Sequence, residues 1–410
     1  MKKSFLYYKT ILIHTLAAIL IGLIIGAVDA LFGRVLLTIT DFRQEHLYLL
    51  LPFLGPAGLL ILFLYRKLSP KSLGGMGLIF DTGFQENKHI PKLLVPLIML
   101  TTWITHLFGG SAGREGVAVQ MGAAISHTIG RKLHVQNNAR LYLLIGMAAG
   151  FAGLFQTPLA AVFFALEVLV AGSLFYEAVI PCLAASFTAG FTSHLLGLEK
   201  FSVIVSDKLV FTPDTIVKLI ITAVIFGIIG GSFAWCLQAA KKRLASWFPN
   251  VYFRILITGI CLSLLLLFIH QGRYTGLGTN LISAAFENQT IYPYDFLLKF
   301  GFTVITLAAG YQGGEVPPLF AIGCTAGILL GNLFGLPVAL TAALGYAAVF
   351  GSATNTLLAP VIIGIEVFGP QNAVYFLIVC SIAYACNGNM TIYGRQRQYQ
   401  GQEWQSRSSK

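Results

Sequence analysis

Two glutamates of this chain lie in glycine-rich turns that interrupt apolar sequence. Glu115 follows Gly113 and Arg114 in "GGSAGREGVAVQMG", and Glu315 follows two glycines in "GYQGGEVPPLFA". Burying an ionisable side chain among apolar residues is costly unless it is paired or changes its protonation state. Because a carboxyl group can bind and release a proton, Glu115 and Glu315 are the candidate residues for proton transfer.

Each of these glutamates also stands at the predicted start of a helix. The first backbone N–H groups of a helix have no partner within it, and the helix dipole adds partial positive charge there. Such a start binds an anion without lysine or arginine, and glycine lets the backbone approach a small ion. A third start is predicted in "KSLGGMGLIFD" (71–81), and a weaker fourth around 353–356. The residues expected to contact an anion at the first three starts are Gly75, Met76, Gly77, Gly116, Val117, Val316 and Pro317.

Proton transfer and anion binding meet at Glu115. A deprotonated carboxylate at a helix start occupies the position where an anion would bind, whereas a protonated one must leave that position. One side chain would thereby couple proton transfer to anion movement. The alternative is structural, with Glu115 capping its helix and Arg114 pairing with a neighbouring carbonyl or carboxylate group.

The composition places these turns in a membrane. Of the 410 residues, 56% are hydrophobic and 10% are charged, against about 25% charged in soluble domains. We therefore predict an all-α, polytopic protein of the cell (inner) membrane. The apolar run near the N-terminus is too long for a signal peptide, so we interpret it as a retained first helix with Lys2, Lys3 and Lys9 on the cytoplasmic side. The net charge of +11 is assigned to loops and to a polar, basic cytoplasmic tail (394–410), and not to a nucleic-acid partner.

The sequence contains none of the metal-binding or catalytic motifs that we considered. The six cysteines stand singly in apolar segments, without a CxxC pair or a Cys/His cluster, so neither a metal nor a cofactor is expected. Nucleophile-elbow, HExxH and phosphate-loop motifs are absent, so the chain is not expected to be an enzyme. Structural or interfacial roles, and not proton relay, are expected for His14, His106, His127 and His270.

Several apolar segments are too short to cross a membrane. A full crossing takes about 20 residues, and segments such as 117–130 and 319–334 are shorter and follow glycine-rich breaks. Short hydrophobic segments interrupted by glycine or proline are typical of broken or re-entrant helices.

The chain also contains an internal duplication. Residues 148–168 ("AAGFAGLFQTPLAAVFFALEV") align without gaps with residues 347–367 ("AAVFGSATNTLLAPVIIGIEV"), and the glycine turns upstream align to within one residue. We therefore predict two membrane repeats, 1–200 and 201–393. Helices broken at matching positions favour the inverted arrangement of transporters.

The duplication pairs two further glutamates, Glu167 and Glu366. Between Gly301 and Cys386 the only charged residues are Glu315 and Glu366. Charged residues at membrane depth are usually functional, but Glu167 and Glu366 stand at helix ends, where a structural role is equally open.

These motifs closely resemble those of the CLC family of chloride channels and proton-coupled anion antiporters. "GREGVAVQMGAA" is similar to the family's G(K/R)EG-P element with its gating glutamate, although Val117 replaces the usual proline. "GGEVPPLF" resembles the GxFxP element, with Val316 where chloride-selective members usually have phenylalanine. Tyr393, in "MTIYG", falls near the family's inner-gate tyrosine. The resemblance implies the CLC-type fold with two inverted repeats, and a homodimer with a separate pore in each subunit.

The departures from the chloride-handling pattern resemble one branch of that family. Met76 stands where chloride members have an anion-coordinating serine, and Val168 stands at the position of their internal proton glutamate. Glu315 is unusual in chloride members, and Pro317 stands where a polar residue such as threonine is expected. The combination resembles the fluoride/proton antiporters, which implies fluoride export driven by inward proton flow with Glu115 as the gating glutamate. A chloride channel or chloride/proton antiporter of the same family is the alternative.

Fluoride holds water tightly, so a binding site must replace that water with well-aimed donors. Backbone N–H groups, aromatic ring edges and a protonated glutamate are suitable. The candidate ring edges are Phe80, Phe84 and Tyr393. Ordinary packing is the alternative for Phe80 and Phe84, and gap filling is the alternative for Met76. The expected partners are fluoride or chloride, protons and membrane lipid.

Overall fold

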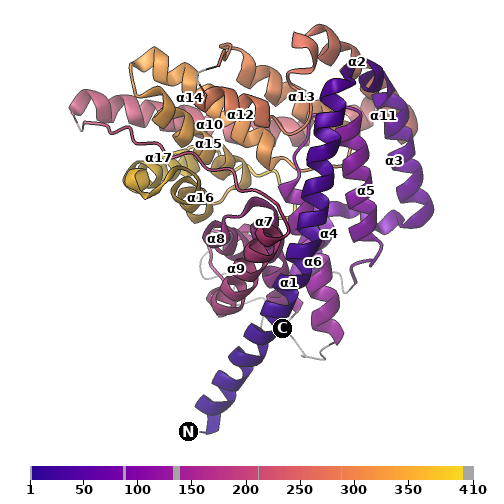
Figure 1. Cartoon of the computed structure of the whole chain (residues 1–410), viewed down its shortest axis with the longest axis vertical. Coiled ribbons are helices and arrows are strands. Elements are labelled where there is room, and N and C mark those ends of the chain that lie inside the picture. Colours follow the sequence, from indigo (N-terminus) through magenta and orange to yellow (C-terminus); the bar gives the residue numbers. More distant parts are fainter. Residues whose placement is uncertain (1, 86–88, 133–138, 211, 288, 400–410) are drawn as a thin grey trace.

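The computed structural model describes residues 2–85, 89–132, 139–210, 212–287 and 289–399, and its regular structure is almost entirely helical (Figure 1). The helices of the first half are α1 (Lys2–Glu45), α2 (Leu47–Leu50), α3 (Leu54–Leu68), α4 (Gly75–Gly83), α5 (Leu94–Leu107), α6 (Glu115–Lys132), α7 (Ala139–Phe155), α8 (Pro158–Val168) and α9 (Val179–Leu195). The helices of the second half are α10 (Pro213–Trp247), α11 (Val251–Phe268), α12 (Thr279–Phe286), α13 (Asp295–Ala309), α14 (Val316–Phe334), α15 (Val338–Thr354), α16 (Leu358–Phe368) and α17 (Ala373–Ala385). The 3₁₀ helices are η1 (Leu51–Phe53), η2 (Pro70–Gly74), η3 (Tyr176–Ala178), η4 (His270–Gly272) and η5 (Pro370–Asn372), and the strands are β1 (Val170–Ala171) and β2 (Arg397–Gln398).

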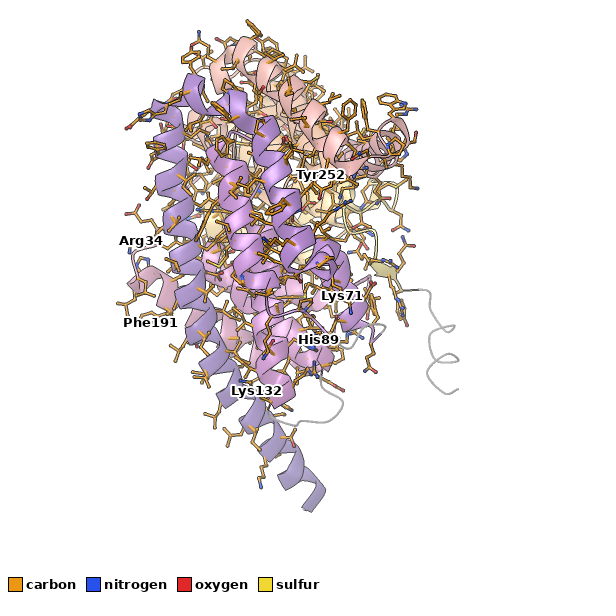
Figure 2. The ribbon with its side chains drawn as sticks, turned by 90° about the vertical axis from the view of Figure 1, so that its right-hand side faces the viewer. Arg34, Lys71, His89, Lys132, Phe191 and Tyr252 are labelled. Atoms are coloured by element: carbon orange, nitrogen blue, oxygen red, sulfur yellow. The ribbon has the colours of Figure 1, made fainter. Side chains whose placement is uncertain are left out.

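The lengths of these helices confirm a multi-pass membrane protein with interrupted helices. Within the described residues, six helical stretches are long and apolar enough to cross a membrane, including those of α1 and α10. Other apolar helices, such as α5, α7, α8, α15 and α16, have only 10–17 residues. Large apolar side chains point outward toward lipid, as Phe191 of α9 does at the edge of the molecule in Figure 2.

Local sequence signals fix several helix ends. The hydroxyl of Thr212 accepts a hydrogen bond from the backbone N–H of Thr215, and Pro213 follows at the first position of α10. Asn250 caps α11 in the same way. Helix α14 ends at Phe334 and is followed by Gly335, whose φ of 65° is a left-handed conformation that favours glycine.

The two repeats meet at the two glycine turns. The N–H of Gly113 donates to the carbonyl of Gly314 at 2.5 Å, and the N–H of Gly314 donates to the carbonyl of Gly113 at 2.7 Å. Such a self-reciprocal pair is what a two-fold relation between the repeats produces. Two residues further on in each repeat, α6 begins at Glu115 and α14 begins at Val316.

This pairing resolves the register of the duplication, which the sequence left uncertain by one residue. Because the two glycines are equivalent, Glu115 corresponds to Val316, and Arg114 corresponds to Glu315. The two turn glutamates are therefore not equivalent positions of the repeat.

The duplicated glutamates Glu167 and Glu366 cap helices of the opposite repeat. The carboxylate of Glu167 accepts hydrogen bonds at 2.8–3.2 Å from the first amides of α16, those of Leu357, Leu358 and Ala359. The carboxylate of Glu366 accepts bonds at 2.9–3.2 Å from the first amides of α8, those of Leu159 and Ala160. The exchange is reciprocal, as inverted repeats require. Their role as helix caps is thus confirmed. The fourth helix start, predicted around 353–356, lies slightly later, because α15 continues through Thr354 and α16 begins at Leu358, where Glu167 accepts the first amides.

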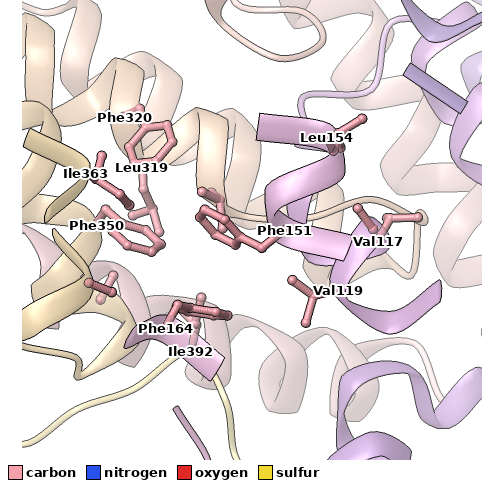
Figure 3. Packing of buried hydrophobic residues seen from close by; sticks show 14 of the residues in the cluster. Val117, Val119, Phe151, Leu154, Phe164, Leu319, Phe320, Phe350, Ile363 and Ile392 are labelled. Atoms are coloured by element: carbon pink, nitrogen blue, oxygen red, sulfur yellow. The ribbon is translucent and has the colours of Figure 1, made fainter. Parts of the chain in front are cut away.

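Phenylalanines from both repeats form the core between them (Figure 3). Phe151 and Phe164 come from α7 and α8, and Phe320 and Phe350 come from α14 and α15. The ring centroids lie 5.1 Å apart for Phe151 and Phe164, 6.1 Å for Phe164 and Phe350, and 5.2 Å for Phe320 and Phe350. Aromatic pairs at such separations contribute beyond the area that they bury.

The described part of the C-terminal tail is docked onto the first repeat. Strand β2 pairs in parallel with β1, and the Gln396 side chain donates to the carbonyl of Val168 at 2.9 Å. The tail predicted at 394–410 is therefore held against the end of α8 where the structure describes it, and residues 400–410 lie outside the described residues. The predicted repeat boundary falls in the extended segment between α9 and α10 and stays a prediction.

Glycine at the crossing of α6 and α7 gives a first testable prediction. A Cβ on Gly122 would overlap the carbonyl oxygen of Gly146, a backbone contact that no rotamer change relieves. We expect Gly122→Ala to lower the free energy of unfolding by about 2 kcal/mol, seen as a lower midpoint in thermal unfolding followed by tryptophan fluorescence. Gly301→Ala is the matched control, because a Cβ there meets nothing within 4 Å. Equal midpoints for the two variants would contradict this packing.

Candidate functional site

A cavity of about 550 Å³ brings together residues that the sequence predicted from distant segments. It is formed by α4, the glycine turns and the segment after α17. The predicted site residues that line it are Gly75, Met76, Gly77, Phe80, Gly116, Glu315 and Tyr393. We call it the large cavity.

Aromatic and glycine residues shape one wall of the large cavity. Gly75 begins α4 after η2 with a φ of 51°, a conformation that side chains disfavour, so glycine is needed at this helix start. Half-buried Met76 follows directly. Phe80 and Tyr393 stack with ring centroids 5.4 Å apart. Phe84 is not part of this wall: it lies at the end of α4 with the Arg397 guanidinium 4.0 Å from its ring centroid.

Cations around the large cavity were missed from the sequence. They are Arg66 of α3, Lys241 of α10, Arg254 of α11 and Arg395 of the C-terminal segment. Arg395 pairs with Asp81 at 3.6 Å, whereas the buried Nε of Arg254 has no acceptor among the described residues. An excess of positive charge around a cavity raises the local concentration of anions. Because the four residues come from four separate segments, no sequence spacing connects them.

Gln120 of α6 was also missed. Its side chain is buried against the large cavity, and its Oε1 has no hydrogen-bond partner among the described residues. A Cβ on Gly75 would lie 3.6 Å from that oxygen. The available signal was the first polar side chain in the apolar run that follows the Glu115 turn.

A smaller cavity of about 80 Å³ lies on the other side of the turn. Arg114, Glu115 and Pro317 line it, together with Phe320 and Tyr346, whose rings are nearly parallel with centroids 4.0 Å apart. Further polar lining comes from Glu199, Thr279 and Ser283. We call it the small cavity.

Glu115 separates the two cavities. Its side chain is buried with 2% exposure, and its carboxylate accepts the N–H of Arg114 at 3.3 Å and lies 3.6 Å from the Arg114 guanidinium. Glu115 lines the small cavity, whereas the next residue, Gly116, lines the large one. A carboxyl group that changes position here therefore has one cavity on each side.

The other predicted anion contacts are placed differently. Val117 and Val316 are buried and line neither of the two cavities. The N–H of Val117 donates to the carbonyl of Arg114, and Pro317 has no N–H, so neither amide can reach an anion. At the start of α6, Gly116 keeps an amide with no protein acceptor among the described residues. In the same described ranges, no group of three or more His, Cys, Asp or Glu side chains could hold a metal ion.

These features define a class of protein: an all-α membrane transport protein in which two repeats bring interrupted helices to a buried ion path. The chain belongs to the voltage gated chloride channel family, whose sequence model matches residues 57–388. It is 34% identical over 388 residues to a chloride/fluoride channel protein of Pseudomonas syringae pv. tomato, covering 92% of this chain and 85% of that protein.

Solved structures agree with this assignment. The crystal structure of a CLC-type fluoride/proton antiporter superposes with a TM-score of 0.94 at 51% sequence identity, over 96% of this chain and 99% of that one. A slow cyanobacterial Cl⁻/H⁺ antiporter shares the fold, with a TM-score of 0.80 at 22% identity over 93% of this chain and 96% of that one.

The two cavities predict which positions a water-soluble thiol reagent reaches. We expect Met76→Cys, at the large cavity, to be modified in the purified protein, and Val316→Cys, with 1% exposure, to stay unmodified. Intact mass gives the number of adducts, in a background where the accessible native cysteines 236, 261 and 386 are serine. Equal labelling of the two positions would contradict the assignment of Met76, and not Val316, to the large cavity.

Proposed function

We propose that this protein exports fluoride from the cell in exchange for protons, with Glu115 as the gating and proton-carrying residue. The observation that carries the proposal is that Glu115 and Gly116, consecutive residues at a helix start, face opposite cavities. An ion crossing between the cavities must pass this helix start, and so must the carboxyl group. The names of the 51% identical antiporter and of the 34% identical channel protein support fluoride as the anion.

The large cavity offers the donors that a small, strongly hydrated anion needs. Gly116, whose amide has no protein acceptor among the described residues, lines this cavity together with Phe80, Tyr393 and the surrounding cations. Hydrogen bonds to a charged acceptor are stronger than those between neutral groups. The side chain of Met76 contributes no N–H or O–H donor to this wall, so the anion depends on backbone amides and ring edges there.

Glu315 is positioned to take the proton on the large-cavity side. It lines that cavity, and its Oε2 lies 3.7 Å from the place of a Cβ on Gly116. Glu115 faces the other cavity one residue away. Glu115 and Glu315 together would replace the internal proton glutamate of chloride antiporters. At that glutamate's position this chain has Val168, which is fully buried and cannot titrate.

The basic residues indicate the orientation. Arg66, Lys241, Arg254 and Arg395 line the large cavity, and positively charged residues accumulate on the cytoplasmic side of membrane proteins. We therefore assign the large cavity to the cytoplasm and the small cavity to the outside of the inner membrane. We further propose a homodimer with one pathway per subunit, which native mass spectrometry of the purified protein would measure.

The ion selectivity is tested in liposomes that contain the purified protein. An outward fluoride gradient should drive proton uptake, and an equal chloride gradient should drive at least tenfold less. A fluoride electrode and a pH dye record both ions at once. Comparable fluoride and chloride turnover would instead support the second candidate, a chloride channel or chloride/proton antiporter. The name of the 34% identical chloride/fluoride channel protein favours keeping this candidate.

The role of Glu115 is tested by Glu115→Gln. Because an amide cannot carry the proton, we expect fluoride-driven proton uptake to fall below a tenth of the wild-type rate, measured in the same liposomes. Glu177→Gln, which changes an exposed glutamate of η3, is the matched control and should keep full coupling. Proton movement in step with fluoride in Glu115→Gln would rule out the mechanism.

A further inference from the structure

Two buried cations lie behind the turn that carries Glu115. Lys299 of α13 and Arg43 of α1 have exposures of 0% and 2%. Within the described residues, neither forms an ion pair with a carboxylate. Buried charges are normally paired, because removing them from water is costly. The inference drawn from them rests on the proposed function.

Lys299 is held by neutral oxygen atoms from two segments. Its Nζ donates to Ser111 Oγ at 2.9 Å and to the carbonyls of Tyr274 and Gly276 at 3.2 and 2.7 Å. An ammonium group has three protons and no lone pair, so these three acceptors satisfy it completely. Lys299 thereby ties the glycine turn of the first repeat to the segment before α12.

Arg43 contacts the same two segments, the one before the Glu115 turn and the one before α12. Its NH1 donates to the carbonyl of His106 at 2.7 Å, and a Cβ on Gly276 would lie 2.8 Å from that nitrogen. The N–H of Gly276 in turn donates to the carbonyl of Gly110 at 3.1 Å. Gly276 therefore contacts both cations and the glycine turn that precedes Glu115.

The segment from His106 to Gly113 transmits this contact to the gate. Ser111 Oγ lies 2.9 Å from Thr303 Oγ1, and the His106 Nε2 lies 3.4 Å from the carbonyl oxygen of Gly113. Arg114 and Glu115 follow directly. The cations thus fix the backbone immediately before the gating carboxylate.

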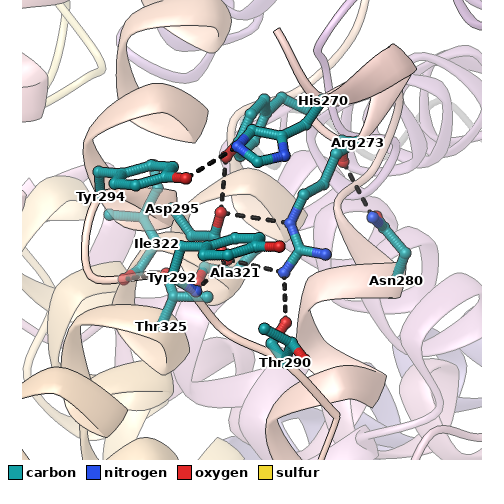
Figure 4. Close-up of polar contacts among 11 residues, drawn as sticks. His270, Arg273, Asn280, Thr290, Tyr292, Tyr294, Asp295, Ala321, Ile322 and Thr325 are labelled. Carbon is teal, nitrogen blue, oxygen red and sulfur yellow. Dashed lines mark hydrogen bonds and ion pairs between the residues drawn. The ribbon is translucent and has the colours of Figure 1, made fainter.

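The acid that precedes Lys299 on its own helix does not neutralise these cations. Asp295 stands one turn before Lys299 on α13, and its carboxylate accepts the Arg273 guanidinium at 2.7 and 3.2 Å and the Tyr274 hydroxyl at 2.6 Å (Figure 4). One carboxylate is thus balanced by one guanidinium. Neither Lys299 nor Arg43 forms an ion pair with a carboxylate among the described residues, and the buried Nε of Arg43 has no acceptor there.

The charged and titratable groups near the gate come from several elements. Around the Glu115 carboxylate they are Arg114 from its own turn, Glu199 after α9, Tyr346 of α15 and Glu315 of the opposite turn. Around Lys299 they are Arg43, His106, Tyr274 and Asp295, and the exposed Asp41 of α1 interacts with Arg43.

We propose that Lys299 and Arg43 are positioning residues that supply fixed positive charge to the gate: they hold the His106–Gly113 segment and favour the ionised form of Glu115, and so set the pH range of exchange. A unit charge about 10 Å from a carboxylate, at an effective dielectric constant of about 20, shifts its ionisation by about one pH unit. Positive charge opposes proton binding. Removing it therefore lets Glu115 stay protonated to higher pH.

The test is the pH profile of fluoride-driven proton uptake by the full-length protein in liposomes. Lys299→Met keeps the length of the side chain and removes the charge. We expect the pH at which exchange falls to half to rise by about one unit. In the double variant Lys299→Met, Glu115→Gln, the remaining fluoride flux should show no such shift, because the titrating carboxyl group is gone.

Other variants separate charge from packing. Arg43→Met should move the profile in the same direction, and Arg43→Lys, which keeps the charge, should restore the wild-type profile. Arg34→Met is the control, since this exposed cation of the same helix donates to the carbonyl of Leu196 away from the gate. If Lys299→Met fails to fold, the comparison of Arg43→Met with Arg43→Lys shows whether the charge sets the pH profile.

The outcomes distinguish this inference from the proposed function. Absence of proton-coupled fluoride flux in the wild type overturns both. Coupled flux in the wild type with an unshifted profile in Lys299→Met or Arg43→Met overturns this inference alone. If the pH profile still shifts in the double variant with Glu115→Gln, the cation does not act through the carboxyl group of Glu115, and this inference is overturned.

Discussion

Backbone amides at helix starts inside a membrane have no water to bind, and each needs an acceptor from the protein or from an ion. This protein meets that need in two ways. At α8 and α16 a glutamate of the opposite repeat accepts the amides directly. At α6, Gly116 lines a cavity and its amide has no protein acceptor among the described residues, beside a carboxylate that belongs to its own turn. The same chemical requirement is thus met by protein caps at two helices, whereas at the third it leaves an amide without a protein acceptor among the described residues.

The two repeats are alike in scaffold and different in chemistry. The glycine pair at the centre makes Arg114 equivalent to Glu315, and Glu115 equivalent to Val316. One repeat therefore presents a carboxylate to the small cavity and the other presents one to the large cavity. The symmetry is broken at the two turns that line the cavities, and is kept where helices are capped and packed.

Much of this could be predicted from the sequence. Low charge, short apolar segments and the duplication indicated the fold, and most residues of the large cavity came from three glycine-rich motifs. The sequence could not give the one-residue register, because that depends on the hydrogen bonds between Gly113 and Gly314. It also missed Gln120, Lys299 and Arg43. Their significance comes from what they face in three dimensions, and each stands alone in its own segment.

The exchanged caps also limit how the molecule can move. Glu167 and Glu366 each hold a helix of the other repeat through the polypeptide backbone, and the phenylalanines between them interlock. Rocking one half against the other would strand five amides and two carboxylates in a medium that cannot solvate them. These contacts therefore favour alternating access through rotations of individual side chains and small loop adjustments over rocking of the two repeats.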